Sequence, residues 1–429
     1  MNIRGILSAP LVFLTFGAYG LIHAAPENGA APPAIPDELK PAVTAPAGSE
    51  TKLRRLKEAL DEPNPKLTAT LREARLSLLT GKPVTDTELL GKLRTWHQAA
   101  NRILQPPLAF PEWSAHDSQV VTLPYLYDGC KILALQARMD GDRQTADKIV
   151  GDLLRWSRDL SNANPIFVEF VIANNGRKRA FEFLFCDLKR HPEPVVRLSQ
   201  IAKFASDYPP DTAARIESLK SDARWALAYL QREETKEESE LNLKFAAASL
   251  KPPFDKLTAD DLRGLPSDDA AESKRIIEHT IQDIACLKAG TPMMKWPTLN
   301  PKPTGHTLAD YANRPNGLGD LLAEYGTSPT YTMLASLISH DLLITACIRW
   351  LELERDGKPI TPEAFADLTD PADGKPLELD IQARVIRCRG IDGKHDTPEP
   401  GASPKPDVGA FMQGNDPCIA VPRWAKSSE

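Results

Sequence analysis

The chain has 429 residues, of which 42% are hydrophobic and 26% are charged, and its formal net charge is −6. It is long enough for two domains, and this composition predicts a globular protein with a real core. The mildly acidic charge argues against nucleic acid as the main partner, because binding to a phosphate backbone requires a basic surface.

The first 25 residues have the pattern of an export signal. One basic residue, Arg4, precedes an apolar run from Ile6 to Ile22, and small residues follow it at Ala24 and Ala25. This pattern predicts a signal peptide over 1–25, or an N-terminal anchor if the segment is not cleaved. The bulk of the protein is therefore expected to be periplasmic or extracellular. No later segment is expected to span a membrane.

The next segment, residues 26–50, is rich in proline and alanine. It contains six prolines and cannot bury a core, so we expect a linker there. A helical domain is predicted over 51–356, because apolar residues recur at helical spacing along most of that range. A small β-hairpin and loop element is predicted over 357–429.

Two stretches of the helical domain align with each other at an offset of sixty residues. They read TELLGKLRTWHQAANRIL and TADKIVGDLLRWSRDL, and each follows another helical segment. Trp96 aligns with Trp156, and Gly81 aligns with Gly141. We therefore expect two related helical hairpins, the unit of helical solenoids, with these glycines at the turns and these tryptophans in the core.

The cysteine count is even, which permits three disulfides in an oxidising compartment. Cys388 and Cys418 form the favoured pair, because both lie in the short C-terminal element and a small element gains most from such a link. The remaining four are either paired or buried as thiols, and the sequence leaves this open. These four are Cys130, Cys186, Cys286 and Cys347.

Catalytic patterns are weak throughout the sequence. His340 and Asp341 are adjacent on a helix and point to different faces, and SAHDSQ (114–119) is too contiguous to form a triad. The chain has no G-x-S-x-G elbow, P-loop, dinucleotide fingerprint or H-E-x-x-H motif. We therefore assign no catalytic residue and no organic cofactor.

The C-terminal element carries the one candidate metal site. DGKPLEL and RVIRC predict a β-hairpin, with CIAV as a third strand. Residues 390–416, called here the acidic C-terminal loop, are rich in Gly and Pro. Carboxylates on such a loop can wrap Ca²⁺, although EF-hand spacing is absent and a solvated acidic loop is the alternative. The candidate ligands are Asp392, Asp396, Asp407 and Asp416.

Two parts of the chain resemble known sequences. LPYLYDGCKILALQARMDGD and LLRWSRDLSNANPIFVEFVIANNGRKRAFEFL look like segments of uncharacterised exported bacterial proteins of planctomycete type, which are α-helical. The DPADGKPLEL hairpin, the GIDGKHD loop and the closing NDPCIAV resemble the C-terminal end of type II secretion pseudopilins. In pseudopilins the matching loop binds calcium, so the resemblance implies Ca²⁺. This chain lacks the run of consecutive aspartates found there.

These observations together predict a mostly α fold, with a solenoid-like body of helical hairpins and a small α+β C-terminal appendage. The predicted function is that of an exported, non-enzymatic interaction or scaffold protein of the cell envelope. Its expected partner is an envelope protein, with membrane contact only through an uncleaved N-terminal segment. The first alternative is a minor pseudopilin-like secretion component with a calcium loop. The second is an extracytoplasmic hydrolase that uses dispersed residues.

Overall fold

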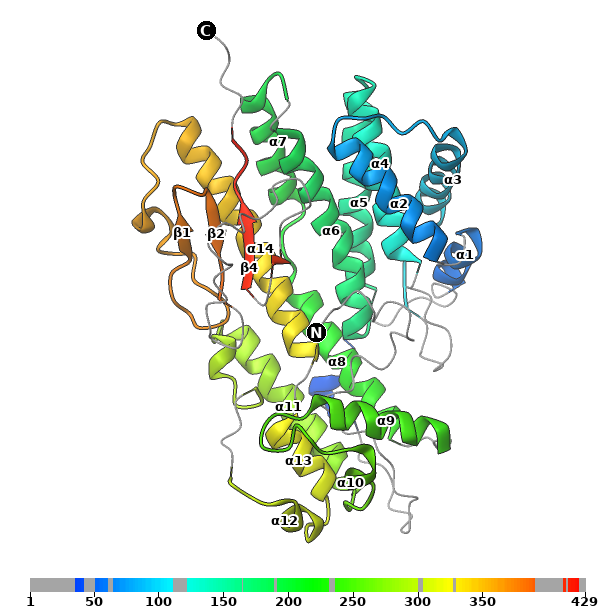
Figure 1. The fold of residues 1–429 in the computed structure, drawn as a ribbon, viewed down its shortest axis with the longest axis vertical. Coiled ribbons are helices and arrows are strands. Elements are labelled where there is room, and N and C mark those ends of the chain that lie inside the picture. The colour runs from blue at the N-terminus through cyan, green and yellow to red at the C-terminus, as the bar shows by residue number, and fades with distance from the viewer. Residues whose placement is uncertain are drawn as a thin grey trace.

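The computed structural model of the chain (Figure 1) is mostly α-helical, with a small antiparallel sheet near the C-terminus. This confirms the predicted mostly α fold class. The residues that the structure describes are 35–41, 51–60, 65–110, 122–163, 165–188, 191–230, 236–299, 304–326, 329–389, 412–413 and 416–423. The predicted signal segment and most of the linker lie outside them.

The first half of the described chain consists of eight α-helices that pack as neighbours. The fourth helix is central, because the second, third, fifth and sixth helices all pack against it. Apolar residues at helical spacing drive this packing. The helices are α1 (Thr51–Ala59), α2 (Pro65–Leu79), α3 (Thr87–Ile103), α4 (Leu123–Met139), α5 (Arg143–Ser161), α6 (Phe167–Leu188), α7 (Pro194–Asp207) and α8 (Thr212–Tyr229).

The turns that end α2 and α4 have the same geometry. Gly81 and Gly141 adopt φ values of 83° and 81°, which favour glycine. The Lys82 N–H donates to the Ser77 carbonyl oxygen at 2.9 Å, and the residue sixty positions later, Asp142, donates in the same way at 2.8 Å. This six-to-one bond is typical of a Schellman helix end. The two predicted turns are therefore present and have the same geometry. The helices that follow them begin at different aligned positions: α5 begins at Arg143, which aligns with residue 83, whereas α3 begins at Thr87.

The second half of the chain adds six helices and a second, smaller core. In this second core Phe254 packs edge-on against Tyr325, with ring centroids 4.8 Å apart. The second core lies in the lower part of Figure 1, between α9, α10, α12 and α13. The helices are α9 (Lys236–Ser249), α10 (Ala259–Arg263), α11 (Asp269–Lys288), α12 (Leu308–Ala312), α13 (Gly317–Tyr325) and α14 (Pro329–Arg355).

The longest helix, α14, joins the helical body to the sheet. Its stretch Met333–Arg355 has the length and composition of a membrane span, and the expectation that no segment after the N-terminus spans a membrane stays a prediction. Most of that stretch is buried inside the protein, where α14 packs against α6, α7 and the sheet. A soluble protein's core helix passes the same test, so this finding is weak evidence for a membrane span.

The sheet has the strand order β1-β2-β4-β3, and all its neighbours are antiparallel. It contains the predicted hairpin and the predicted third strand. Arg384 anchors it to α14: the residue adopts a positive φ of 56°, binds Glu354 and lies 5.8 Å from the Trp350 ring. The strands are β1 (Glu378–Asp380), β2 (Val385–Arg387), β3 (Met412–Gln413) and β4 (Asp416–Ala420).

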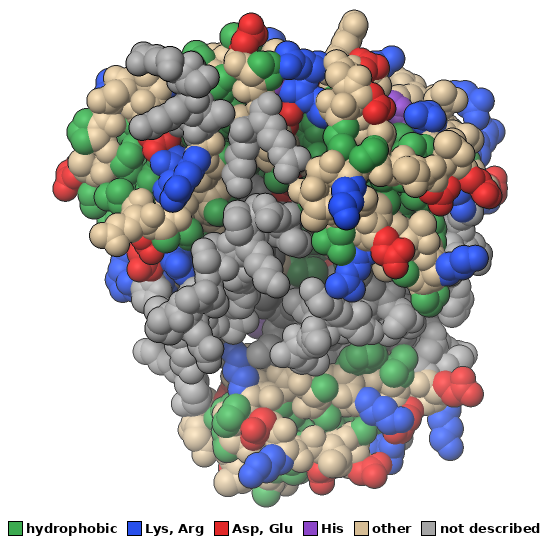
Figure 2. Space-filling view, turned by 45° about the horizontal axis from the view of Figure 1, so that its top comes forward, with side chains coloured by type: hydrophobic (Ala, Val, Ile, Leu, Met, Phe, Trp, Pro, Cys, Tyr) green, Lys and Arg blue, Asp and Glu red, His purple; other side chains and the backbone are tan. Residues whose placement is uncertain are grey.

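The surface carries charges of both signs. On the face shown in Figure 2, acidic, basic and hydrophobic side chains are interspersed rather than gathered into one field.

Candidate functional site

The predicted calcium ligands are not tested by the structure. Asp392, Asp396 and Asp407 lie outside the described residues. Asp416 begins β4, but its side chain also lies outside the description. Among the described residues, no group of three or more His, Cys, Asp or Glu side chains could hold a metal ion. The calcium site therefore stays a prediction.

The favoured cysteine pair lies on neighbouring strands. Cys388 and Cys418 are both buried, and β2 pairs with β4 so that Arg387 is opposite Cys418. The Cys388 N–H donates to the Pro417 carbonyl oxygen at 2.8 Å. The two cysteines are thus close along the strands but one residue out of register, which turns side chains to opposite faces of a regular sheet. No disulfide is seen among the cysteines that the structure describes, and the pairing stays a prediction.

The tryptophans of the two related stretches are both buried. Trp96 in α3 is 2% exposed, and Trp156 in α5 is 0% exposed. The ring of His97 lies against Trp156, with ring centroids 5.5 Å apart. These contacts bring the polar residues of α3 and α5 together at the edge of the core.

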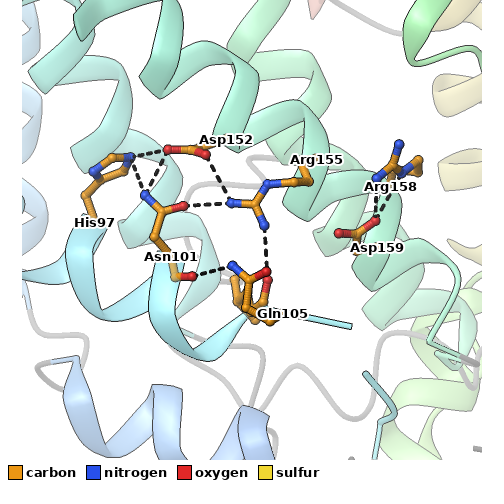
Figure 3. A network of polar contacts seen from close by, with 8 residues as sticks. His97, Asn101, Gln105, Asp152, Arg155, Arg158 and Asp159 are labelled. Carbon is orange, nitrogen blue, oxygen red and sulfur yellow. Dashed lines mark hydrogen bonds and ion pairs between the residues drawn. The ribbon is translucent and has the colours of Figure 1, made fainter. Parts of the chain in front are cut away.

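Four side chains of α3 and α5 form a hydrogen-bonded network (Figure 3). The His97 Nε2 atom lies 3.0 Å from the Asp152 Oδ2 atom, and the Asn101 side-chain amide donates to the same oxygen at 2.8 Å. Arg155 Nη2 donates to Asp152 Oδ1 at 3.0 Å and to Asn101 Oδ1 at 2.7 Å. Burial alone raises the pKa of Asp152, but the hydrogen bonds from His97, Asn101 and Arg155 outweigh it and lower that pKa.

The carboxylate of Asp152 is fully used within the network. Both oxygens of Asp152 accept hydrogen bonds within the network, and a further bond runs from Arg155 Nη1 to the Leu104 carbonyl oxygen at 3.3 Å. A His–Asp pair can orient a general base, but a nucleophile or a bound substrate must then lie within hydrogen-bond reach of it. As arranged here, the network holds α3 to α5.

A second group of charged side chains, called here the basic cluster, joins α4 to α6. Lys131 Nζ lies 2.6 Å from Glu182 Oε2, and both side chains are buried. Arg179 contacts Glu182 Oε2 and Asp128 Oδ1, at 3.0 Å each, and Arg75 of α2 lies 3.8 Å from Asp128 Oδ1. Burial raises the pKa of Glu182, but the basic neighbours outweigh it and hold that pKa well below its ordinary value.

Two buried carboxyl groups accept hydrogen bonds from backbone amides at the start of α6, those of Ile166 and Phe167. Glu169 Oε2 accepts from the Ile166 N–H at 3.0 Å, and Asp222 of α8 accepts from the Phe167 N–H. Burial raises the pKa of Glu169 to about 8 and that of Asp222 to about 7, and the charge of Asp222 adds to the shift of Glu169. One Asp222 oxygen has no hydrogen-bond partner in the described part of the chain. Burial therefore favours the protonated form of both carboxyl groups.

Asp341 of α14, considered with His340 for acid–base chemistry, instead forms ion pairs between helices. Asp341 binds both Arg177 of α6 and Arg215 of α8, so its carboxylate links three helices. An aspartate held by two arginines is an ion-pair acceptor rather than a base. His340 is buried beside it on the same helix.

None of these clusters was predicted from the sequence. His97 and Asp152 are 55 residues apart, and Lys131 and Glu182 are 51 apart, so only helix packing brings them together. One sequence signal could have indicated the ion pair of Lys131: this charged residue lies on an otherwise apolar stripe of α4. Such a residue must find a partner across the interface.

No protein-family model, no curated protein and no solved structure matches the chain. The resemblance to exported planctomycete-type proteins and to pseudopilins therefore rests on the quoted motifs alone.

Proposed function

We propose that the protein is an exported, non-enzymatic interaction protein of the cell envelope, in which solenoid-like paired helices hold a partner. The observation that best supports this proposal is the His97–Asp152 network, in which both Asp152 oxygens accept hydrogen bonds from neighbouring side chains. It is the arrangement among the described residues that most resembles a catalytic pair, and its hydrogen bonds are used to join two helices.

The other ion pairs in the helical body support the same proposal. Lys131 with Glu182 joins α4 to α6, and Asp341 joins α14 to α6 and α8. Buried ion pairs of this kind add little stability over apolar packing, but breaking one is costly, so they fix how helices sit against one another. A rigid helical surface suits the binding of a partner.

A second candidate function is that of an extracytoplasmic hydrolase. It is favoured by the contact of His97 Nε2 with Asp152, because the other ring nitrogen then points away from the carboxylate (Figure 3). A neutral imidazole oriented in this way can accept a proton from water. This candidate requires a substrate site beside α3.

Cell fractionation followed by native electrophoresis tests the leading proposal. The protein is expected in the exported fraction, in a complex larger than the 47.2 kDa chain. A His97→Gln variant is expected to keep that complex, because Gln can still hydrogen-bond to Asp152. A cytoplasmic protein, or an exported monomer, would contradict the proposal. An exported monomer would favour the hydrolase if the His97→Gln variant also fails to replace the wild type in cells that lack the protein.

A further inference from the structure

Lys178 lies on α6 four residues before Glu182, which places it on the same helix face, and we add it to the basic cluster. It makes no ion pair with the residues that the structure describes. It lies on α6 beside Arg179 and is half-buried. Burial lowers the pKa of its ammonium group to about 8; Glu182 opposes this shift, whereas Arg179 and Lys131 add to it. Glu182 Oε2 is already in contact with Lys131 and Arg179, so one carboxylate serves three cations. A partly desolvated cation that is neutralised so incompletely favours an incoming anion.

Arg75 is the second member with unused binding capacity. Its nearest carboxylate contact, to Asp128, measures 3.8 Å, which is longer than a hydrogen bond. Its buried Nε atom has no hydrogen-bond partner within the described ranges. That atom is out of reach of a ligand, but the side chain is 21% exposed and its terminal Nη1 makes only this long contact among the described residues, so the end of the guanidinium group is available on the α2 side of the cluster.

The charges of the cluster do not balance. The cluster holds four basic side chains, Arg75, Lys131, Lys178 and Arg179, and two carboxylates, Asp128 and Glu182, which leaves a net charge of +2. Lys131 and Glu182 form a buried floor, whereas the side chains of Arg75, Asp128 and Arg179 are 21%, 29% and 28% exposed. The unbalanced positive charge can therefore be reached from solvent, on a protein whose net charge is −6.

We infer that the basic cluster binds an acidic segment of a polypeptide partner, whose carboxylates pair with Lys178 and Arg75. The inference rests on the proposed function, because it names the chemistry of the partner that the helical surface would hold. The two incompletely neutralised cations lie on different helices, Lys178 on α6 and Arg75 on α2, and the Asp128–Arg179 ion pair connects the two sides of the cluster. Two separate carboxylates of an extended segment match this division better than one compact dianion does.

Calorimetric titration of the purified full-length protein with a hexaglutamate peptide tests the inference. The wild type is expected to bind hexaglutamate but not hexaglutamine, and to bind more weakly as salt is added. Lys178→Gln is expected to weaken binding at least tenfold. The matched control is Lys203→Gln on α7, because Lys203 is exposed and already paired with Asp207 at 3.0 Å. This control is expected to bind like the wild type.

Thermal unfolding without peptide shows whether the Lys178→Gln variant has a folding defect. Removing a half-buried unpaired charge is expected to leave the melting temperature of Lys178→Gln unchanged or higher. NMR of the labelled lysine amines is expected to show the pKa of Lys178 rising when hexaglutamate binds. Equal binding by the wild type and Lys178→Gln, or no binding by the wild type, would overturn the inference. Inorganic phosphate that binds as tightly as hexaglutamate and displaces it would also overturn it, in favour of a small-anion site.

The two proposals fail in different ways. A large native complex in cells, together with no hexaglutamate binding, would mean that the partner uses another surface. Hexaglutamate binding with no complex in cells would leave the anion site standing and remove the proposed function.

Discussion

Glu169 and Asp222 are predicted to make the protein less stable as the pH rises through neutrality. Their pKa values of about 8 and about 7 in the folded chain compare with about 4 for unfolded carboxyl groups. The folded chain therefore holds protons that the unfolded chain has released. Because folding raises both pKa values, the two groups stabilise the folded chain most below about pH 4. This stabilisation is lost as the pH rises toward about 8.

The size of the effect follows from proton linkage. One proton bound by the folded chain but not by the unfolded chain changes the unfolding free energy by about 1.4 kcal/mol per pH unit. The charge of Asp222 raises the pKa of Glu169, so the two groups titrate together, and we assign about one proton to the pair between about pH 6 and pH 8. The unfolding free energy is then expected to fall by on the order of 2 kcal/mol over that range.

Urea unfolding of the wild type and of the Glu169→Gln, Asp222→Asn double variant measures this loss. The amide side chains keep an oxygen that can accept from Ile166 and Phe167, but they do not ionise. The double variant is therefore expected to lose the decrease between pH 6 and pH 8. The exposed control Asp255→Asn is expected to keep it.

The comparison between the variants matters more than either curve alone. His279 is a separate contributor, because burial lowers its pKa to about 4 and it destabilises the folded chain as the pH falls below about 6.5. That dependence has the opposite sign and is common to all the variants. Parallel curves for the wild type and the double variant would refute the proposed protonation of the pair.

Four further outcomes are expected. Trp156→Ala should lower the unfolding free energy by about 3–5 kcal/mol in chemical denaturation, as for a core aromatic; a change near zero would place it outside the core. Gly81→Ala and Gly141→Ala should cost similar amounts, about 1–2 kcal/mol, because an added Cβ meets nothing within 4 Å at either site and only the positive φ matters; clearly unequal costs would contradict the shared turn. Cys388 and Cys418 should be oxidised together in the exported protein, and a thiol assay that labels only one would exclude the pair. Millimolar Ca²⁺ should raise the melting temperature if the acidic C-terminal loop is a site, and no shift would argue against it.

The local features of the fold could be predicted from the sequence. The glycine turns after α2 and α4 and the buried tryptophans of α3 and α5 follow from glycine's freedom at positive φ and from helical periodicity. The β-hairpin follows from short β-prone runs between turn residues. Each of these signals lies within some twenty residues of sequence.

The remainder depends on contacts between distant segments. Phe254 and Tyr325 meet in the second core although seventy-one positions separate them, and no local pattern marks the pair. The same holds for His97 with Asp152, and for the convergence of Arg177 and Arg215 on Asp341. Sequence patterns show which residues are apolar or charged on a helix face, but the packing of the helices decides which of them meet.

Photo-crosslinking in living cells tests most directly whether the protein works by holding a partner. A photoreactive residue at position 72 of α2, one turn before Arg75 and exposed, is compared with one at the exposed position 255. We predict one reproducible envelope protein captured from position 72, reduced in the Lys178→Gln background, and absent from position 255. Equal capture from both positions, or no capture from either, would contradict a function in partner binding through these helices.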